Sequence, residues 1–157
     1  MLDRTLIGKK YPVVEFKVSA WHLKFFSKVT GQTDPIYFDH EYAKKKNYKS
    51  VVCPPTFLMV AGMEQNNFYK YLQDFNVAIE SILHAEQEFI YNELIYEGDS
   101  LKIETMIEDM FDKKKGLLQF CTFKSKFTIP GQVLLMEPKF NTLFLVILAS
   151  LSIVVIS

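Results

Sequence analysis

The 157-residue sequence has few of the residues that mark metal sites and disulfide frameworks. It contains two cysteines and three histidines. Cys53 and Cys121 lie far apart, neither belongs to a CxxC pair, and His22, His40 and His84 do not fall at metal-ligand spacings with them. We therefore expect two free thiols, no metal and no cofactor.

A net charge is also missing, because 18 Lys and Arg residues balance 18 Asp and Glu residues. Without a basic excess, no global field attracts nucleic acid or an anionic membrane. No charged-then-apolar signal peptide precedes Leu6, which together with free thiols favours a reducing, cytoplasmic location. Any partner has to be sought in local features.

Apolar and aromatic residues, in contrast, are plentiful. The chain is 49% hydrophobic and holds 14 Phe and 8 Tyr, and its length suits one domain with a substantial core. A thick interior alone explains this composition. A subunit interface or a tunnel for an apolar ligand would explain it as well.

The N-terminal third carries signals for one strand and two helices. From Pro12 to Val18, apolar and charged residues alternate with the period of a half-buried strand. Ser19 is a favoured N-cap for a helix whose apolar residues recur at helical spacing until Gly31 ends it. Asp39 can cap a second, short helix from Glu41 to Lys46, which a proline-containing loop follows.

The rest of the chain indicates one long helix followed by consecutive strands. Good helix formers with an apolar start predict a helix from Thr56 to about Phe75 that is buried in its N-terminal half. Turns with Gly or Pro separate the strands that we predict next: about Ile82 to Tyr91, Ser100 to Met110, Leu117 to Thr128, and Val133 onward. The fold class is therefore α+β, with one long buried helix against an antiparallel sheet.

The C-terminus is an almost unbroken apolar run from Leu143 to Ile156. It falls short of the roughly 18 residues that a spanning helix needs, and it is rich in β-branched residues. We expect a last core strand and an apolar tail, with a reading-frame artefact and a membrane tail anchor as alternatives. The expected division is a single domain over residues 1–147 and a tail over residues 148–157.

Three segments resemble the MaoC-like dehydratases, in particular their FAS1-like N-terminal dehydratase branch. They are "LIGKKYPVVEFKV", "FSKVTGQTDPIYFDHEYAKKKNYKSVVCPPTFL" and "LHAEQEFIYNELIYEGDSLKI", which together span most of Leu6 to Leu135. The resemblance implies a hotdog fold, in which an antiparallel sheet wraps around a central helix. It also implies a hydro-lyase activity on a (3R)-hydroxyacyl or enoyl thioester of CoA or acyl carrier protein.

Catalytic members of that family use an Asp and a His within a G-D-x-N-P-x-H pattern. The pair removes a proton from the α-carbon and protonates the leaving hydroxyl, while a backbone N–H binds the thioester oxygen. Here Gln32, Asp34 and Tyr37 stand at the positions of the Asp, the Asn and the His. A primary amide is no base near neutral pH, and a tyrosine with a pKa of about 10 poorly replaces a histidine.

The expected oxyanion donor is also altered. Catalytic relatives place a Gly at the start of the central helix, and Pro55 stands at that position. Proline has no N–H, so the donor is missing unless the register differs by one residue and Thr56 supplies it.

These departures predict a degenerate subunit that shapes an acyl-chain channel. We expect a hotdog dimer, with a separate catalytic subunit as the second chain. The resemblance implies substrate contacts for Tyr37, Cys53, Pro55, Thr56, Lys45 and Lys46. A non-enzymatic acyl-CoA or acyl-carrier-protein binding module is the alternative, and a thioesterase is a weaker third.

Three polar features each allow a functional and an ordinary interpretation. Asp34 is either a lone acid or base, or an acceptor for backbone N–H groups in its turn. The triplet Lys44 to Lys46 either docks a phosphate or an acidic carrier protein, or forms a solvated helix end. His84, Glu86 and Glu88 alternate along one predicted strand face, as in any half-exposed strand, and we expect no metal there.

Overall fold

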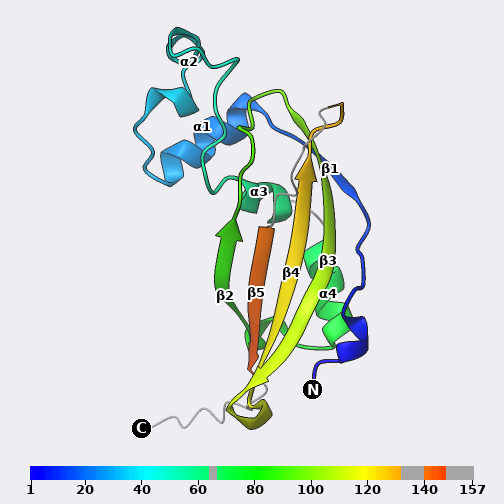
Figure 1. Ribbon diagram of the computed structural model, residues 1–157. Coiled ribbons are helices and arrows are strands. Elements are labelled where there is room, and N and C mark those ends of the chain that lie inside the picture. The colour runs from blue at the N-terminus through cyan, green and yellow to red at the C-terminus, as the bar shows by residue number, and fades with distance from the viewer. Residues whose placement is uncertain (64–66, 132–139, 148–157) are drawn as a thin grey trace, which may run out of the picture.

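Five antiparallel strands form one sheet in the computed structural model, which describes residues 1–63, 67–131 and 140–147 (Figure 1). The strands are β1 (Val14–Lys17), β2 (Ile82–Phe89), β3 (Ser100–Lys113), β4 (Leu118–Thr128) and β5 (Phe140–Ile147). Their order across the sheet is β1-β3-β4-β5-β2. Among the described residues β2 pairs with β5 alone, so its other side is an open edge of the sheet.

Four α-helices accompany the sheet in the described part of the chain: α1 (Ala20–Val29), α2 (His40–Lys45), α3 (Leu58–Met63) and α4 (Asn67–Phe75). Single turns of 3-10 helix lie at η1 (Arg4–Leu6), η2 (Pro35–Tyr37), η3 (Ile79–Ser81) and η4 (Lys114–Gly116). Helices α3 and α4 lie along one face of the sheet, whereas α1 and α2 project at one end of it (Figure 1). The α+β class is confirmed, and the predicted long helix is described as α3 and α4, with residues 64–66 between them outside the described residues.

Local capping explains where the first two α-helices begin. The Ser19 hydroxyl accepts a hydrogen bond from the His22 N–H at 3.3 Å, and the Asp39 carboxylate accepts from the Tyr42 N–H at 3.0 Å. Each cap satisfies a backbone donor that has no partner inside its helix. Both predicted caps are confirmed, and α2 begins one residue earlier than predicted.

The core forms where one face of β3 meets the helices. Leu101, Ile103 and Ile107 are buried at every second position, and Thr105 continues the same face. Phe57, just before α3, is fully buried against this face. Burying one such side chain contributes about 1.5–3 kcal/mol, so this face of the sheet holds the helices in place.

The predicted single face of His84, Glu86 and Glu88 is wrong. A register shift in β2 leaves Ala85 unpaired, so that His84 and Glu86 lie opposite consecutive residues of β5. Consecutive strand residues point to opposite faces, which places His84 and Glu86 on different faces of the sheet. The bulge therefore separates the imidazole from both carboxylates.

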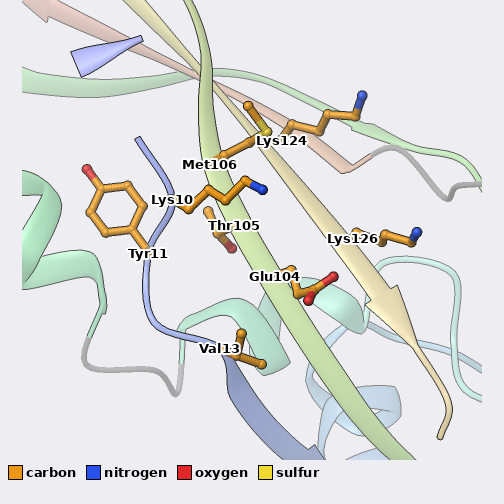
Figure 2. Close-up of a pocket in the computed structure, with 8 residues that line it drawn as sticks. All are labelled: Lys10, Tyr11, Val13, Glu104, Thr105, Met106, Lys124 and Lys126. Atoms are coloured by element: carbon orange, nitrogen blue, oxygen red, sulfur yellow. The ribbon is translucent and has the colours of Figure 1, made fainter. Parts of the chain in front are cut away.

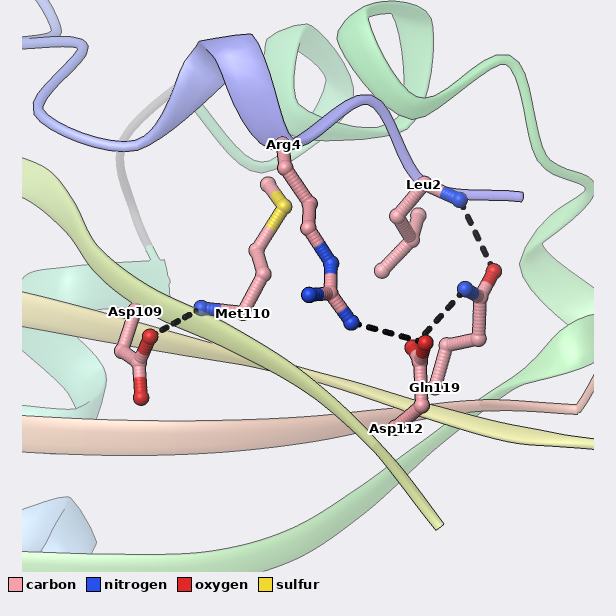
Figure 3. A network of polar contacts seen from close by, with 6 residues as sticks. All are labelled: Leu2, Arg4, Asp109, Met110, Asp112 and Gln119. Atoms are coloured by element: carbon pink, nitrogen blue, oxygen red, sulfur yellow. Dashed lines mark hydrogen bonds and ion pairs between the residues drawn. The ribbon is translucent and has the colours of Figure 1, made fainter. Parts of the chain in front are cut away.

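A polar network ties the N-terminal segment to the hairpin of β3 and β4 (Figure 3). The buried Gln119 side chain accepts a hydrogen bond from the Leu2 N–H at 2.8 Å and donates one to Asp112 at 3.0 Å. The same carboxylate pairs with Arg4 at 2.7 Å. One buried amide thus satisfies a backbone donor and orients an ion pair.

No helix within the described residues is both long and apolar enough to cross a bilayer. Residues 148–157 lie outside the described part, as do residues 133–139 of the predicted last strand. The division into residues 1–147 and a tail stays a prediction.

We predict that Gln119→Ala lowers the free energy of unfolding by about 1–3 kcal/mol, because the buried Leu2 N–H loses its acceptor. Arg4→Ala is the matched control, since it breaks only an exposed ion pair worth about 0–1 kcal/mol. Urea denaturation measures both. Equal losses in the two variants would show that the amide has no special role.

Candidate functional site

Backbone hydrogen bonds bring three distant segments together near α1 and α2. The Val52 N–H donates to the Ile36 carbonyl at 2.9 Å, and the Cys53 N–H donates to the Ile95 carbonyl at 2.7 Å. The Glu97 N–H donates a hydrogen bond to the Val51 carbonyl at 3.0 Å. The loop of residues 30–39, called the site loop below, is thereby held against residues 51–53.

The site loop keeps its shape through its own turn geometry. Gly31 has a positive φ of 71°, which suits a residue without a Cβ just after α1. Pro35 begins η2, where its fixed φ is favourable. The Asp34 carboxylate accepts from the Ile36 N–H at 3.1 Å, so this side chain caps η2, in line with its interpretation as a turn residue.

The side chains at the other two positions, Gln32 and Tyr37, make no comparable contact with the described residues. Gln32 is exposed, and its backbone N–H donates to the Ser27 carbonyl at 2.9 Å. Tyr37 is half-buried at the end of η2. The loop thus presents an amide, a capping carboxylate and a phenol, with no imidazole within residues 30–39.

Pro55 and Thr56 lie exposed in the turn that leads into α3, directly after the buried Pro54. Pro55 has no N–H to offer, whereas its carbonyl accepts a hydrogen bond from the Tyr91 hydroxyl. Tyr91 was not predicted as a site residue. It lies just beyond β2, far from Pro55 in the sequence, and no local pattern marks it.

Cys53 is buried beside this turn. Burial raises the pKa of its thiol well above the ordinary value, and the nearby Asp99 carboxylate adds to the rise. Because the thiolate is the nucleophilic form of cysteine, Cys53 is not an activated nucleophile here, and its side chain belongs to the hydrophobic core.

A small apolar cavity of about 30 Å³ lies between the start of α3 and the chain beyond β2. It holds about one water molecule and is far below the roughly 300 Å³ of a small-molecule site. The described chain alone therefore contains no room for an acyl chain at this place. The lining residues are Leu58, Ile90, Tyr91, Asn92, Glu93, Leu94, Ile95, Leu101, Phe127 and Ile129.

Polar side chains around the site loop are engaged with one another. His40 Nε2 lies 2.8 Å from Glu97 Oε2, to which the Ser50 hydroxyl also donates at 3.1 Å. Lys45 is exposed at the end of α2, and Lys46 Nζ lies 5.6 Å from the centre of the Tyr42 ring. Within the described residues, no group of three or more His, Cys, Asp or Glu side chains is arranged to hold a metal ion.

A larger groove of about 290 Å³ opens on the sheet face away from the helices (Figure 2). Lys10, Lys124 and Lys126 point toward the same side as Glu104. A hydrogen bond from Lys102 and the charges of nearby lysines outweigh burial and lower the pKa of Glu104. The groove shares no lining residue with the site loop, so it takes no part in the candidate site.

Solved structures with the same architecture define the class of fold. The HadBC complex, a (3R)-hydroxyacyl-ACP dehydratase from Mycobacterium tuberculosis, matches with a TM-score of 0.71 at 21% identity, covering 88% of this chain and 96% of that chain. A MaoC-like dehydratase matches with a TM-score of 0.78 at 20% identity, covering 92% of this chain and 43% of that chain. The ChsH1-ChsH2 complex from Mycobacterium tuberculosis matches with a TM-score of 0.69 at 16% identity, covering 88% and 84% of the two chains. The fold is the hotdog fold, as predicted.

Sequence comparison identifies the family. The family described as "FAS1-like, dehydratase domain region" matches residues 5–135, and the chain belongs to it. A UPF0336 protein of Streptomyces avermitilis is 28% identical over 112 residues, which are 69% of this chain and 73% of that protein. The UPF0336 protein Rv0504c of Mycobacterium tuberculosis is 27% identical over 118 residues, 73% of this chain and 70% of that protein.

We predict that Asp34→Ala lowers the free energy of unfolding by about 0.5–2 kcal/mol, because η2 loses its cap. Asp34→Asn keeps an acceptor oxygen and should cost clearly less. Chemical denaturation of the two variants checks this, with Gln32→Ala as an exposed control from the same loop. Equal destabilisation by Ala and Asn would rule out the capping role.

Proposed function

We propose that this chain is the non-catalytic subunit of a (3R)-hydroxyacyl-thioester dehydratase or enoyl-thioester hydratase of fatty-acid metabolism. In this proposal a second hotdog chain provides the catalytic Asp and His, and this chain shapes the channel for the acyl group. The observation that carries it is the site loop, whose turn residues Gly31 and Pro35 are kept while Gln32 and Tyr37 replace the base and the acid. A cytoplasmic location belongs to the proposal, since both cysteines are free and buried.

Several polar side chains near the site loop already have partners or are buried, which supports this division of labour. Asp34 caps η2, His40 pairs with Glu97, and Cys53 is buried with a raised pKa. Dehydration needs a base and an acid positioned at the same substrate. The capping of η2 by Asp34 and the pairing of His40 with Glu97 therefore engage two side chains that could otherwise serve as an acid or a base.

The open edge of β2 supports pairing with a second chain. An exposed strand edge presents unpaired backbone N–H and C=O groups that a second strand can satisfy. Ile79 and Leu83, just before and within β2, are 51% and 52% exposed. The HadBC and ChsH1-ChsH2 structures are complexes of two different chains, which is the arrangement proposed for this chain.

The test is hydration of a trans-2-enoyl-CoA, followed by the loss of its conjugated absorbance. We expect no turnover by the purified chain and clear turnover after addition of a hotdog partner with a G-D-x-N-P-x-H pattern. Purification of this chain as an active homodimer would refute the division of labour. Thioester binding without turnover in any mixture would instead favour a non-enzymatic acyl-thioester-binding module.

We predict that Leu83→Lys weakens association with the partner by about tenfold or more, because it places a charge at the paired edge. Leu117→Lys is a matched control, since Leu117 is 59% exposed and lies at the β3–β4 hairpin, which β5 separates from the open edge of β2. Sedimentation velocity over a range of concentrations measures both. Unchanged association of the Leu83 variant would exclude β2 as the pairing edge.

A further inference from the structure

The outward face of α1 carries a row of large exposed side chains. Trp21, Phe25 and Val29 are 67%, 54% and 62% exposed. They recur every four residues and therefore lie along one side of the helix. A contiguous exposed apolar row of this kind marks an interaction surface. These three residues are called the aromatic ridge below.

The aromatic ridge is held in place before any partner arrives. The rings of Trp21 and Phe25 are stacked at 5.3 Å with an angle of 4° between them. Beneath them, Leu23 is fully buried, and the ring of Phe26 meets Phe57 edge-on at 5.5 Å. Ordered aromatic side chains lose little entropy on binding, which is the property of residues that dominate binding energy at interfaces.

The helix that carries the ridge is positively charged. Lys24 and Lys28 lie on the same helix, and α1 contains no acidic residue. From Ser19 to Lys49 the sequence holds six lysines and three acidic residues, a net charge of +3, within a chain whose net charge is zero. Glu97 and Asp99 also lie at this end, where they pair with His40 and Lys49, so Lys24 and Lys28 on α1 are the lysines beside the ridge that would attract an acidic partner.

The ridge also lies next to the candidate site. Helix α1 runs directly into the site loop and packs against η2, and α1 and α2 project at the same end of the sheet (Figure 1). Neither the small apolar cavity nor the larger groove includes a ridge residue. A small molecule binds in a concavity, whereas a convex aromatic row with a basic rim suits a protein surface.

We propose that the aromatic ridge and Lys24 and Lys28 dock an acidic carrier-protein domain, which presents its acyl thioester at the site loop. This inference rests on the proposed function and selects carrier-bound thioesters over CoA thioesters as substrates. The ridge fills an apolar patch on the carrier, and the lysines meet the carboxylates around it.

Direct binding tests this without turnover, because Trp21 is the only tryptophan of the chain. Adding a purified acyl carrier protein should shift the Trp21 emission to shorter wavelength, saturably, and less so as salt rises from about 50 to about 200 mM. Lys24→Glu with Lys28→Glu should weaken binding by about tenfold or more. Lys114→Glu with Lys115→Glu, at the η4 turn, should leave it unchanged. Equal weakening in both pairs, or a shift with anionic vesicles and none with the carrier, overturns the inference.

Kinetics of the two-chain complex separate this inference from the proposed function. Trp21→Ser with Phe25→Ser should lower kcat/KM for an enoyl-carrier substrate by about tenfold or more and leave that for the enoyl-CoA within about twofold. Thermal unfolding checks that the exposed substitutions leave the fold intact. Equal effects on the two substrates overturn the docking inference and leave the proposed function standing. Absence of turnover on both substrates overturns the proposed function. In that case the shift of Trp21 emission on adding the carrier alone decides the docking inference.

Discussion

The backbone hydrogen bonds that join residues 51–53 to Ile36, Ile95 and Glu97 are the constraint on which the site depends. They hold the loop after α1, the turn before α3 and the end of the β2–β3 connection as one unit. Because peptide groups supply these hydrogen bonds, their energy depends little on which side chains the loop carries. Gly31 and Pro35 suit the local geometry by their backbone conformations.

Under the proposed function, this separation of shape from side chain explains how a hydratase-type loop keeps its shape without an acid and a base. A loop held by peptide groups tolerates Gln32 and Tyr37 as readily as Asp and His. The side chains that remain have local tasks: Asp34 caps η2, and Tyr91 bonds to the Pro55 carbonyl. In the proposed function, such a subunit contributes walls and docking surface to a shared site, since fold alone does not determine which chain carries the chemistry.

The features that sequence predicted correctly are those set by neighbouring residues. Ser19 and Asp39 were identifiable as caps because an N-cap depends on a few adjacent positions, and strand alternation is equally local. The bulge at Ala85 was missed because register is decided by the partner strand. The contact of Tyr91 with Pro55 and the burial of Gln119 likewise depend on how distant segments meet, which periodicity does not encode.

The most direct test changes one hydroxyl in the reconstituted two-chain complex. Tyr37→Phe removes the phenol oxygen of this chain and keeps its ring. If proton transfer lies with the Asp and His of the second chain, kcat for enoyl-thioester hydration stays within about twofold of the unchanged complex. A loss of about 100-fold or more in kcat from an intact complex is what removal of a general acid produces, and it would contradict the account.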